Sequence, residues 1–233
     1  MKRSIYLSPS TQEHNVGVGS YGNEEMQMNR LADIVEELLT RQGIQVYRNK
    51  PDWSLQRLVQ DSNSKEVSLH LALHSNAGGA GKVRGCEVFA YTPGGNSEKA
   101  ARAIYAELEP LTPAADRGVK FNPKLYELKE TLAPAILVEI GFHDNKEDAH
   151  WISNHLEDIG KALAKGSLKY LGVSYVERTS ELDKALQLLQ EFDLLQSSEY
   201  WRNNAVKGKT VAGEHAATLI QRVAAYILKG GIR

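Results

Sequence analysis

One carboxylate inside an otherwise apolar segment constrains this chain more than any other feature. In the segment Ala-Ile-Leu-Val-Glu-Ile at residues 135–140, Glu139 is the only polar side chain. A continuous apolar run of this kind predicts a strand at the centre of a sheet that is covered on both faces. An ionised carboxylate that is dry and unpaired there would cost several kcal/mol. Glu139 therefore needs a cation, a metal ion or strong hydrogen-bond donors, or must become protonated.

The segments around Glu139 alternate between strand and helix patterns. Four further segments have strand character, at residues 4–7, 44–47, 67–73 and 86–91. Apolar residues at three- and four-residue spacing predict longer helices at residues 25–39, 97–109 and 152–171, and a short one is expected at 55–60. This alternation predicts an α/β fold, with a mainly parallel twisted sheet flanked by helices on both faces.

Composition excludes several classes of protein. A net charge of −1 over 233 residues provides no broad basic field for nucleic acid. The single cysteine, Cys86, cannot form an internal disulfide or a thiolate zinc site, and we expect it in the core. No apolar run approaches the roughly 20 residues that span a bilayer, so membrane insertion is not expected. Residues 1–9 begin with basic residues but lack a long apolar stretch and a cleavage site, so we expect synthesis in the cytoplasm without a signal peptide.

Near residue 174 the alternation of strand and helix patterns ends, and only helical patterns follow. We expect a catalytic domain at residues 1–174 and a small helical module at 180–233, with Ser180 as a helix N-cap. The helices of the module are predicted at residues 181–192, 198–204 and 211–228. About 50 residues is marginal for independent folding, so the module is expected to lean on a neighbour or a partner.

Polar residues gather where strands end or helices begin, which is where ligands bind in α/β sheets. His14 follows the first strand, Glu25 opens the first long helix, and His74 ends the third strand. Two imidazoles and one carboxylate form the ligand set of a catalytic zinc ion with one open position. Glu139 would then act as the carboxylate that moves protons during hydrolysis.

Other interpretations of these residues remain open at this point. Glu139 could form a salt bridge with Arg117 or Lys120, and His74 could be a structural residue. His143, just past the central strand, is the strongest rival metal ligand. A helical metal pair of His70 with His74 fails, because four residues along a strand span about 13 Å.

Six ordered blocks give residues 1–172 a family resemblance. They lie at residues 25–30, 73–77, 85–91, 116–120, 135–142 and 144–148. In their order and spacing they resemble the zinc-dependent N-acetylmuramoyl-L-alanine amidases of the type-3 class, found in bacterial autolysins, spore-lysis enzymes and phage endolysins.

The resemblance implies that Glu25 and His74 bind zinc and that Glu139 is catalytic. The first ligand of the family is a histidine directly after the first strand, usually in a Gly-His-Gly turn, which residues 8–15 lack. His14 is the only histidine before the third strand and is taken as this ligand, with Glu13 as an outside candidate.

Two adjacent glutamates at the start of the first helix could supply the carboxylate ligand. Glu24 stands beside Glu25, and Asn29, four residues after Glu25, favours Glu25 as the ligand. The resemblance also implies Arg117 and Asn76 as contacts for the substrate.

The implied reaction is hydrolysis of the amide between N-acetylmuramic acid and L-alanine in bacterial peptidoglycan, after release through a holin or on lysis of the cell. The alternatives are another zinc amidohydrolase or peptidase on an α/β scaffold, and a non-catalytic wall-binding protein. The helical module is expected to bind the wall or to pair subunits into a homo-oligomer.

Overall fold

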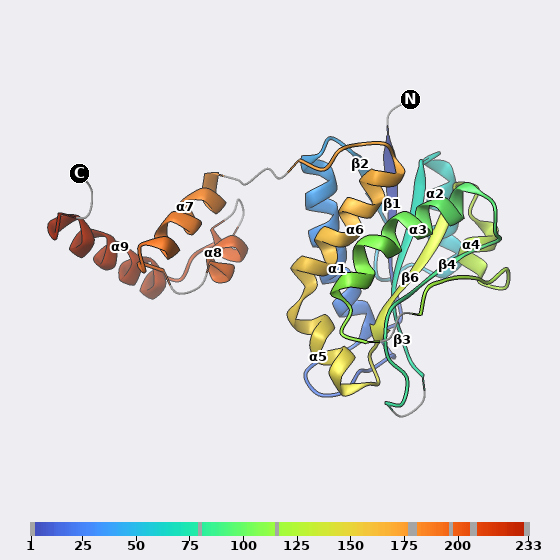
Figure 1. The fold of residues 1–233 in the computed structure, drawn as a ribbon, viewed down its shortest axis with the longest axis horizontal. Coiled ribbons are helices and arrows are strands. Elements are labelled where there is room, and N and C mark those ends of the chain that lie inside the picture. The colour runs from blue at the N-terminus through green and yellow to red at the C-terminus, as the bar shows by residue number, and fades with distance from the viewer. Residues whose placement is uncertain are drawn as a thin grey trace. The chain divides into compact units, whose positions relative to one another are not determined.

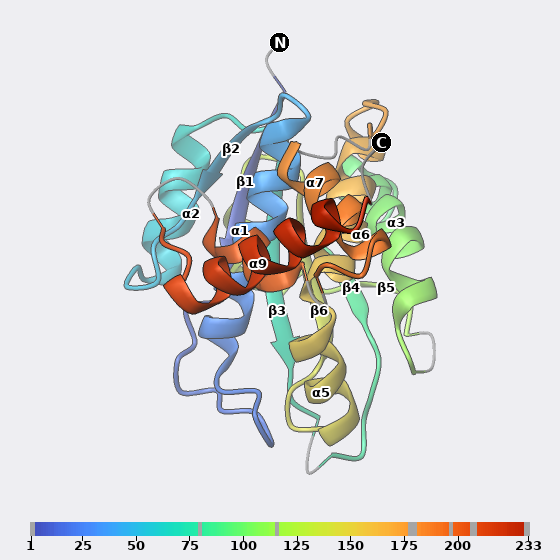
Figure 2. The same cartoon turned by 90° about the vertical axis from the view of Figure 1, so that its left-hand side faces the viewer.

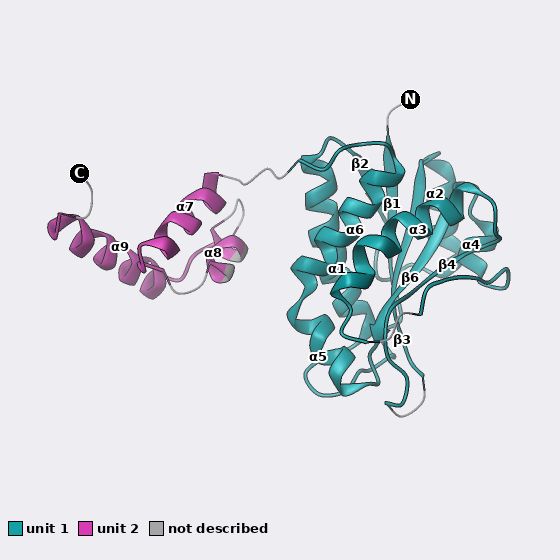
Figure 3. Cartoon of the chain, viewed as in Figure 1, with its two compact units in different colours: residues 1–176 teal, residues 177–233 magenta. Residues whose placement is uncertain are grey.

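The protein divides into two compact units, residues 1–176 and residues 177–233 (Figure 3). The structure, a computed structural model, describes residues 3–78, 81–114, 117–176, 181–195, 198–205 and 209–230. Ser180, the expected N-cap of the helical module, lies outside these residues.

The first unit contains a six-stranded sheet in the order β2-β1-β3-β6-β4-β5. All neighbouring strands run parallel except β4 and β6, which are antiparallel. The strands are β1 (Ser4–Pro9), β2 (Gln45–Arg48), β3 (Leu69–Asn76), β4 (Glu87–Ala90), β5 (Val119–Phe121) and β6 (Ala135–Phe142). The predicted α/β fold with a mainly parallel sheet is confirmed.

Helices cover both faces of this sheet (Figure 1). The larger core lies under α1, α3, α5 and α6, and the smaller one beside α4. Alternate residues of one strand enter different cores, since Leu71 of β3 packs in the larger core and Ala72 in the smaller one. The helices of this unit are α1 (Glu24–Arg41), α2 (Leu55–Ser64), α3 (Asn96–Leu108) with a 3₁₀ turn at Glu109–Leu111, α4 (Tyr126–Glu130), α5 (Lys146–Asn154) and α6 (Leu156–Tyr170).

The two neighbouring central strands bring His74 and Glu139 together. β3 and β6 run side by side in both views, with α5 beyond the carboxyl end of β6 (Figures 1 and 2). His74 pairs in register with Glu139, and alternation along the strands places both on the face of the smaller core. The candidate chemistry therefore lies near the carboxyl ends of the central strands.

Three elements differ from those predicted. The prediction of a single helix at residues 152–171 is wrong, because two helices cover this region. One, α5, begins at Lys146, and the next, α6, begins at Leu156. His155 separates the two helices with a non-helical backbone, φ −126° and ψ 26°. Neither β5 nor α4 was predicted, since three and five residues are too few to show a period.

The second unit contains three helices, α7 (Glu181–Glu191), α8 (Glu199–Asn204) and α9 (Gly213–Leu228). Leu186 and Leu195 are its buried apolar side chains among the described residues. Tyr200 and Trp201 of this unit are half-buried and line a cavity of about 240 Å³. In the described parts of both units, no helix combines the length and the apolar character needed to cross a membrane.

Candidate functional site

A carboxylate and an imidazole meet at the carboxyl end of β3. The Oε1 atom of Glu24 lies 2.8 Å from Nδ1 of His74, and the Glu24 side chain is almost fully buried. Burial opposes ionisation of Glu24, but hydrogen bonds and charge from His74, with a bond from Asn15, lower its pKa. Burial likewise disfavours the charged form of His74, yet Glu127 and Glu24 raise its pKa. The pair thus attracts positive charge, carried by a proton or by a metal ion.

The start of α1 explains why Glu24 is the residue in contact with His74. The Asn23 side chain accepts a hydrogen bond from the Met26 amide at 2.8 Å, which fixes the first turn of the helix. Successive helical residues point about 100° apart, so only one of two neighbouring glutamates can face His74. Glu25, the predicted ligand, is half-buried and is not among the described contacts of His74. The structure thus places Glu24, and not the predicted Glu25, against His74.

Asn29, which favoured Glu25 in the sequence, has a structural role. Its amide nitrogen donates to the backbone oxygen of Glu25 at 2.8 Å, and its Oδ1 accepts from Arg48 at 2.7 Å. The four-residue spacing therefore reflects bonds that tie α1 to β2.

His14 does not join this pair in the structure. It is exposed in a turn of the loop after β1. The residues of this loop that reach the site are Gln12, whose Nε2 lies 3.5 Å from Nδ1 of His74, and Asn15, whose Nδ2 donates to Oε2 of Glu24 at 2.6 Å. Glu13, the outside candidate, is also exposed.

Glu139 differs from Glu24 and Glu127 in its hydrogen bonding. Among the described residues its Oε2 atom is buried with no hydrogen bond. Burial raises the pKa of Glu139 to about 7, with the charge of His74 opposing this rise and the charges of Glu24 and Glu87 adding to it. A carboxyl group with this pKa can both accept and donate a proton near neutral pH.

The cations suggested as partners of Glu139 bind Glu87 instead. Arg117 Nε donates to Glu87 Oε2 at 2.8 Å, Lys120 forms an ion pair with the same atom, and Asn76 Nδ2 donates to Glu87 Oε1 at 3.0 Å. Glu87 lies opposite Glu139 across the antiparallel strands β4 and β6. The structure thus places Arg117 and Asn76 on Glu87, which faces Glu139 across the two strands.

Glu127 of α4 is a member of the site that sequence reasoning missed. It is buried, and its two oxygens lie 2.8 Å from Nε2 of His70 and 3.9 Å from Nε2 of His74. His70 is in turn held by Ser62 at 2.8 Å and stacks on Tyr6. Because α4 has only five residues, no periodicity in the sequence marks Glu127. His74 therefore stands between two carboxylates, Glu24 at Nδ1 and Glu127 near Nε2.

His143, the rival ligand, has a structural environment. It is buried, its Nδ1 lies 2.9 Å from Oγ of Ser75, and its ring stacks on Tyr21. The hydroxyls of Tyr21 and Ser75 are 2.7 Å apart, which completes a buried network behind His74. Cys86 is buried in the larger core, as expected.

The donor set fits a metal ion only in part. Glu24 and His74 supply an oxygen and a nitrogen of the kinds that zinc binds. Among the residues that the structure describes, however, no group of three His, Cys, Asp or Glu side chains is placed to hold a metal ion. Gln12 and Asn15 bring amide groups to the pair, and the carboxylate of Glu127 lies 3.9 Å from Nε2 of His74.

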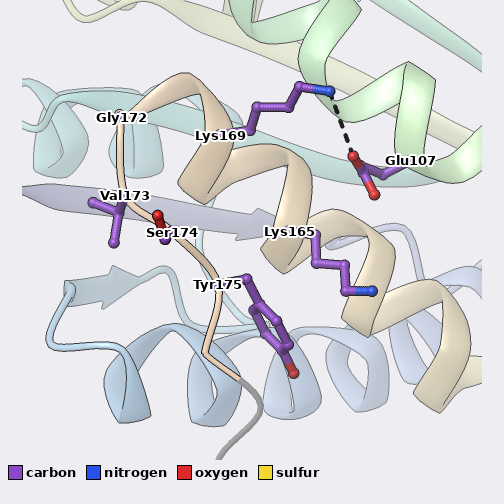
Figure 4. Close-up of a pocket in the computed structure, with 7 residues that line it drawn as sticks. All are labelled: Glu107, Lys165, Lys169, Gly172, Val173, Ser174 and Tyr175. Atoms are coloured by element: carbon purple, nitrogen blue, oxygen red, sulfur yellow. Dashed lines mark ion pairs between the residues drawn. The ribbon is translucent and has the colours of Figure 1, made fainter.

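A cavity of the first unit lies apart from these residues. It measures about 430 Å³ and is lined by Glu107, Lys165, Lys169 and residues 172–175 (Figure 4). The end of α6 that forms it lies away from the carboxyl ends of the strands (Figure 1). An ion pair of 3.6 Å joins Lys169 to Glu107 there, so both charges are already matched.

Comparisons with known proteins agree with this fold. The germination-specific N-acetylmuramoyl-L-alanine amidase of Bacillus subtilis is 26% identical over 134 residues, covering 57% of this chain and 56% of that protein. The N-acetylmuramoyl-L-alanine amidase CwlM of Bacillus licheniformis is 27% identical over 179 residues, covering 73% of this chain and 69% of that protein. This chain thus spans little more than half the length of the Bacillus subtilis relative.

A solved structure shares the architecture of the first unit. The catalytic domain of CwlV, an N-acetylmuramoyl-L-alanine amidase from Bacillus (Paenibacillus) polymyxa var. colistinus, superposes with a TM-score of 0.68 at 20% identity, over 74% of this chain and 99% of that domain. The family model Amidase_3, N-acetylmuramoyl-L-alanine amidase, matches residues 5–169, most of the first unit. The chain belongs to this amidase family.

Proposed function

We propose that the first unit hydrolyses the amide bond between N-acetylmuramic acid and L-alanine in bacterial peptidoglycan. Family membership supports the reaction class. The observation that carries the proposal is the buried, unpartnered Oε2 atom of Glu139 next to the pair of Glu24 and His74. A proton-accepting carboxylate beside a site for positive charge is what hydrolysis of an amide requires.

Glu24 and His74 are the residues that would hold a zinc ion. Their facing atoms, Oε1 and Nδ1, already lie 2.8 Å apart. When bound, zinc would supply a Lewis acid that polarises the scissile carbonyl and lowers the pKa of water. Glu127, near Nε2 of His74, favours the tautomer that leaves Nδ1 free for the metal.

Glu139 would take a proton from the attacking water and give it to the leaving amine of L-alanine. Its strand holds it rigidly opposite His74, so the carboxylate needs no reorganisation to meet the substrate. The pKa of about 7 that burial produces suits both halves of this transfer.

Arg117 and Asn76 would contact the stem peptide beside the scissile bond. The Nε–H of Arg117 is bonded to Glu87, and its guanidinium lies over the Phe142 ring at 4.9 Å. These contacts orient the group, and its remaining N–H donors suit a carboxylate of the peptide.

The test is digestion of purified peptidoglycan by the full chain with zinc supplied. The proposal expects new amino groups on L-alanine, without new reducing ends. Other new peptide termini would identify a different zinc peptidase, and wall binding without any product would identify a non-catalytic protein.

The second unit would serve the first by binding the wall or by pairing two copies of the chain. Large apolar side chains of this unit remain exposed, namely Leu188, Phe192, Ile220, Ile227 and Leu228. Such a surface favours a partner. Sedimentation of the full chain, alone and with insoluble peptidoglycan, separates pairing from wall binding. The chain would reach the wall after synthesis in the cytoplasm, through a holin or on lysis of the cell.

A further inference from the structure

The candidate metal site lacks a third ligand of the usual kind. Glu24 contacts Nδ1 of His74 at the carboxyl end of β3, and among the described residues no group of three His, Cys, Asp or Glu side chains is placed to hold a metal ion. His14, expected in this position, is exposed in its turn. A catalytic zinc ion usually takes three protein ligands and leaves one position open.

Gln12 is a further side chain that lies beside the pair of Glu24 and His74. Its Nε2 atom lies 3.5 Å from Nδ1 of His74, the nitrogen that also contacts Glu24. Gln12 thus reaches the pair from the loop after β1, the same loop in which a ligand was expected.

The backbone holds Gln12 in this place. The amide of Ser10 donates to the carbonyl oxygen of Leu73, next to His74, at 3.0 Å. The amide of Gln12 donates to Oγ of Ser10 at 3.2 Å, and its carbonyl accepts from the amide of Asn15 at 3.2 Å. The loop is therefore bonded to β3 just before Gln12 and forms a turn just after it, and the Gln12 side chain lies beside His74.

Asn15 joins Gln12 to the other side of the pair. Its Nδ2 donates to Oε1 of Gln12 at 3.0 Å and to Oε2 of Glu24 at 2.6 Å. Gln12, Asn15, Glu24 and His74 therefore form a closed ring of polar side chains. Coordination of a cation needs the amide oxygen in place of Nε2, and a half-turn of the Gln12 carboxamide brings it there at the cost of the bond from Asn15.

We propose that the Gln12 carboxamide oxygen is the third protein ligand of the metal site, in place of His14. This inference rests on the proposed function, because it assumes that Glu24 and His74 bind zinc. An amide oxygen is a weaker zinc ligand than an imidazole, so the site should hold zinc less tightly than it would with histidine at position 12.

The experiment measures zinc affinity of the full chain by competition with a chromophoric chelator, which needs no activity. The variants are Gln12→Ala, Gln12→His and His14→Ala. Glu24→Gln serves as the reference, because it removes a ligand that the proposed function already assigns. We expect Gln12→Ala to weaken zinc binding by at least about tenfold and Gln12→His to strengthen it, while His14→Ala leaves it unchanged.

Two results would overturn the inference and leave the proposed function standing. One is that His14→Ala weakens zinc binding while Gln12→Ala leaves it unchanged, which would make His14 the ligand. The other is unchanged affinity in both alanine variants while Glu24→Gln loses zinc. A wild-type chain that binds zinc no better than Glu24→Gln would instead contradict the proposed function, and this inference with it.

Discussion

Glu24 and His74 are fifty residues apart in the chain, yet Oε1 of one lies 2.8 Å from Nδ1 of the other. Glu25, the next residue along α1, lies outside this contact and is only half-buried. Two adjacent, chemically identical side chains therefore differ in their access to His74, and they form a matched pair for mutagenesis.

Replacing Glu24 by Gln keeps the size of the side chain and removes its charge. We expect zinc affinity to fall at least about tenfold, because an anionic ligand is lost. Glu25→Gln should bind zinc as the wild type does. Metal content after dialysis against limiting zinc distinguishes the two, and equal losses in both variants would contradict the assignment of Glu24.

Glu139 should make the metal-free protein less stable at alkaline pH. Its pKa is raised to about 7 by burial, so between the ordinary pKa of a glutamate and 7 the folded state binds a proton that the unfolded state has released. Stability from this group is therefore present at low pH and lost as the pH rises through 7. We expect metal-free Glu139→Gln to exceed the wild type in unfolding free energy by about 1–3 kcal/mol at pH 8.

Denaturant unfolding at pH 8 and at pH 4 measures this difference. The two proteins should converge at pH 4, where Glu139 is protonated in both the folded and the unfolded state. A gap of the same size at both values of pH would show that the substitution acts through packing and not through ionisation.

Glu127 should stabilise the first unit through His70. Glu127→Ala leaves the imidazole of His70 buried without the partner that it now has at 2.8 Å. We expect a loss of about 2–4 kcal/mol in unfolding free energy. Glu130→Ala removes an exposed carboxylate from the same short helix and should change the stability by less than about 0.5 kcal/mol. A loss in Glu127→Ala as small as that of this control would contradict the role given to Glu127.

Arg117 should act on substrate binding more than on the chemical step. Removing its guanidinium by Arg117→Ala should raise KM by about tenfold, the effect of losing one charge-assisted hydrogen bond, with kcat changed little. Lys99→Ala, an exposed cation on α3, serves as the control for loss of one positive charge. A fall in kcat with KM unchanged would place Arg117 in the chemistry instead.

Features of the fold and of the candidate site could be predicted from the sequence where a pattern was long or chemically unusual. The apolar run around Glu139 predicted a central strand with one carboxylate inside it, and β6 confirms that strand. His74 was found because strand ends in α/β sheets collect ligands. Both inferences depend on local pattern, which a single sequence displays.

The remaining features depend on geometry that spacing does not encode. One residue of register at the start of α1 decides which of Glu24 and Glu25 contacts His74, and Asn29, which favours Glu25 in the sequence, is bonded to Arg48 in the structure. Glu127 comes from a five-residue helix whose position is set by packing against β6. Residue type favours His14 in the loop after β1, whereas the structure leaves His14 exposed and places Gln12 beside His74.

The central claim is that Glu139 moves protons beside a metal held by Glu24 and His74. The direct measurement compares wild type and Glu139→Gln for release of L-alanine amino groups from purified peptidoglycan, with zinc content determined on the same samples. We expect the rate to fall by about 10²–10⁴ while bound zinc is retained, since a general acid–base group is lost and a ligand is not. Release of L-alanine amino groups at the wild-type rate in the variant would contradict the account.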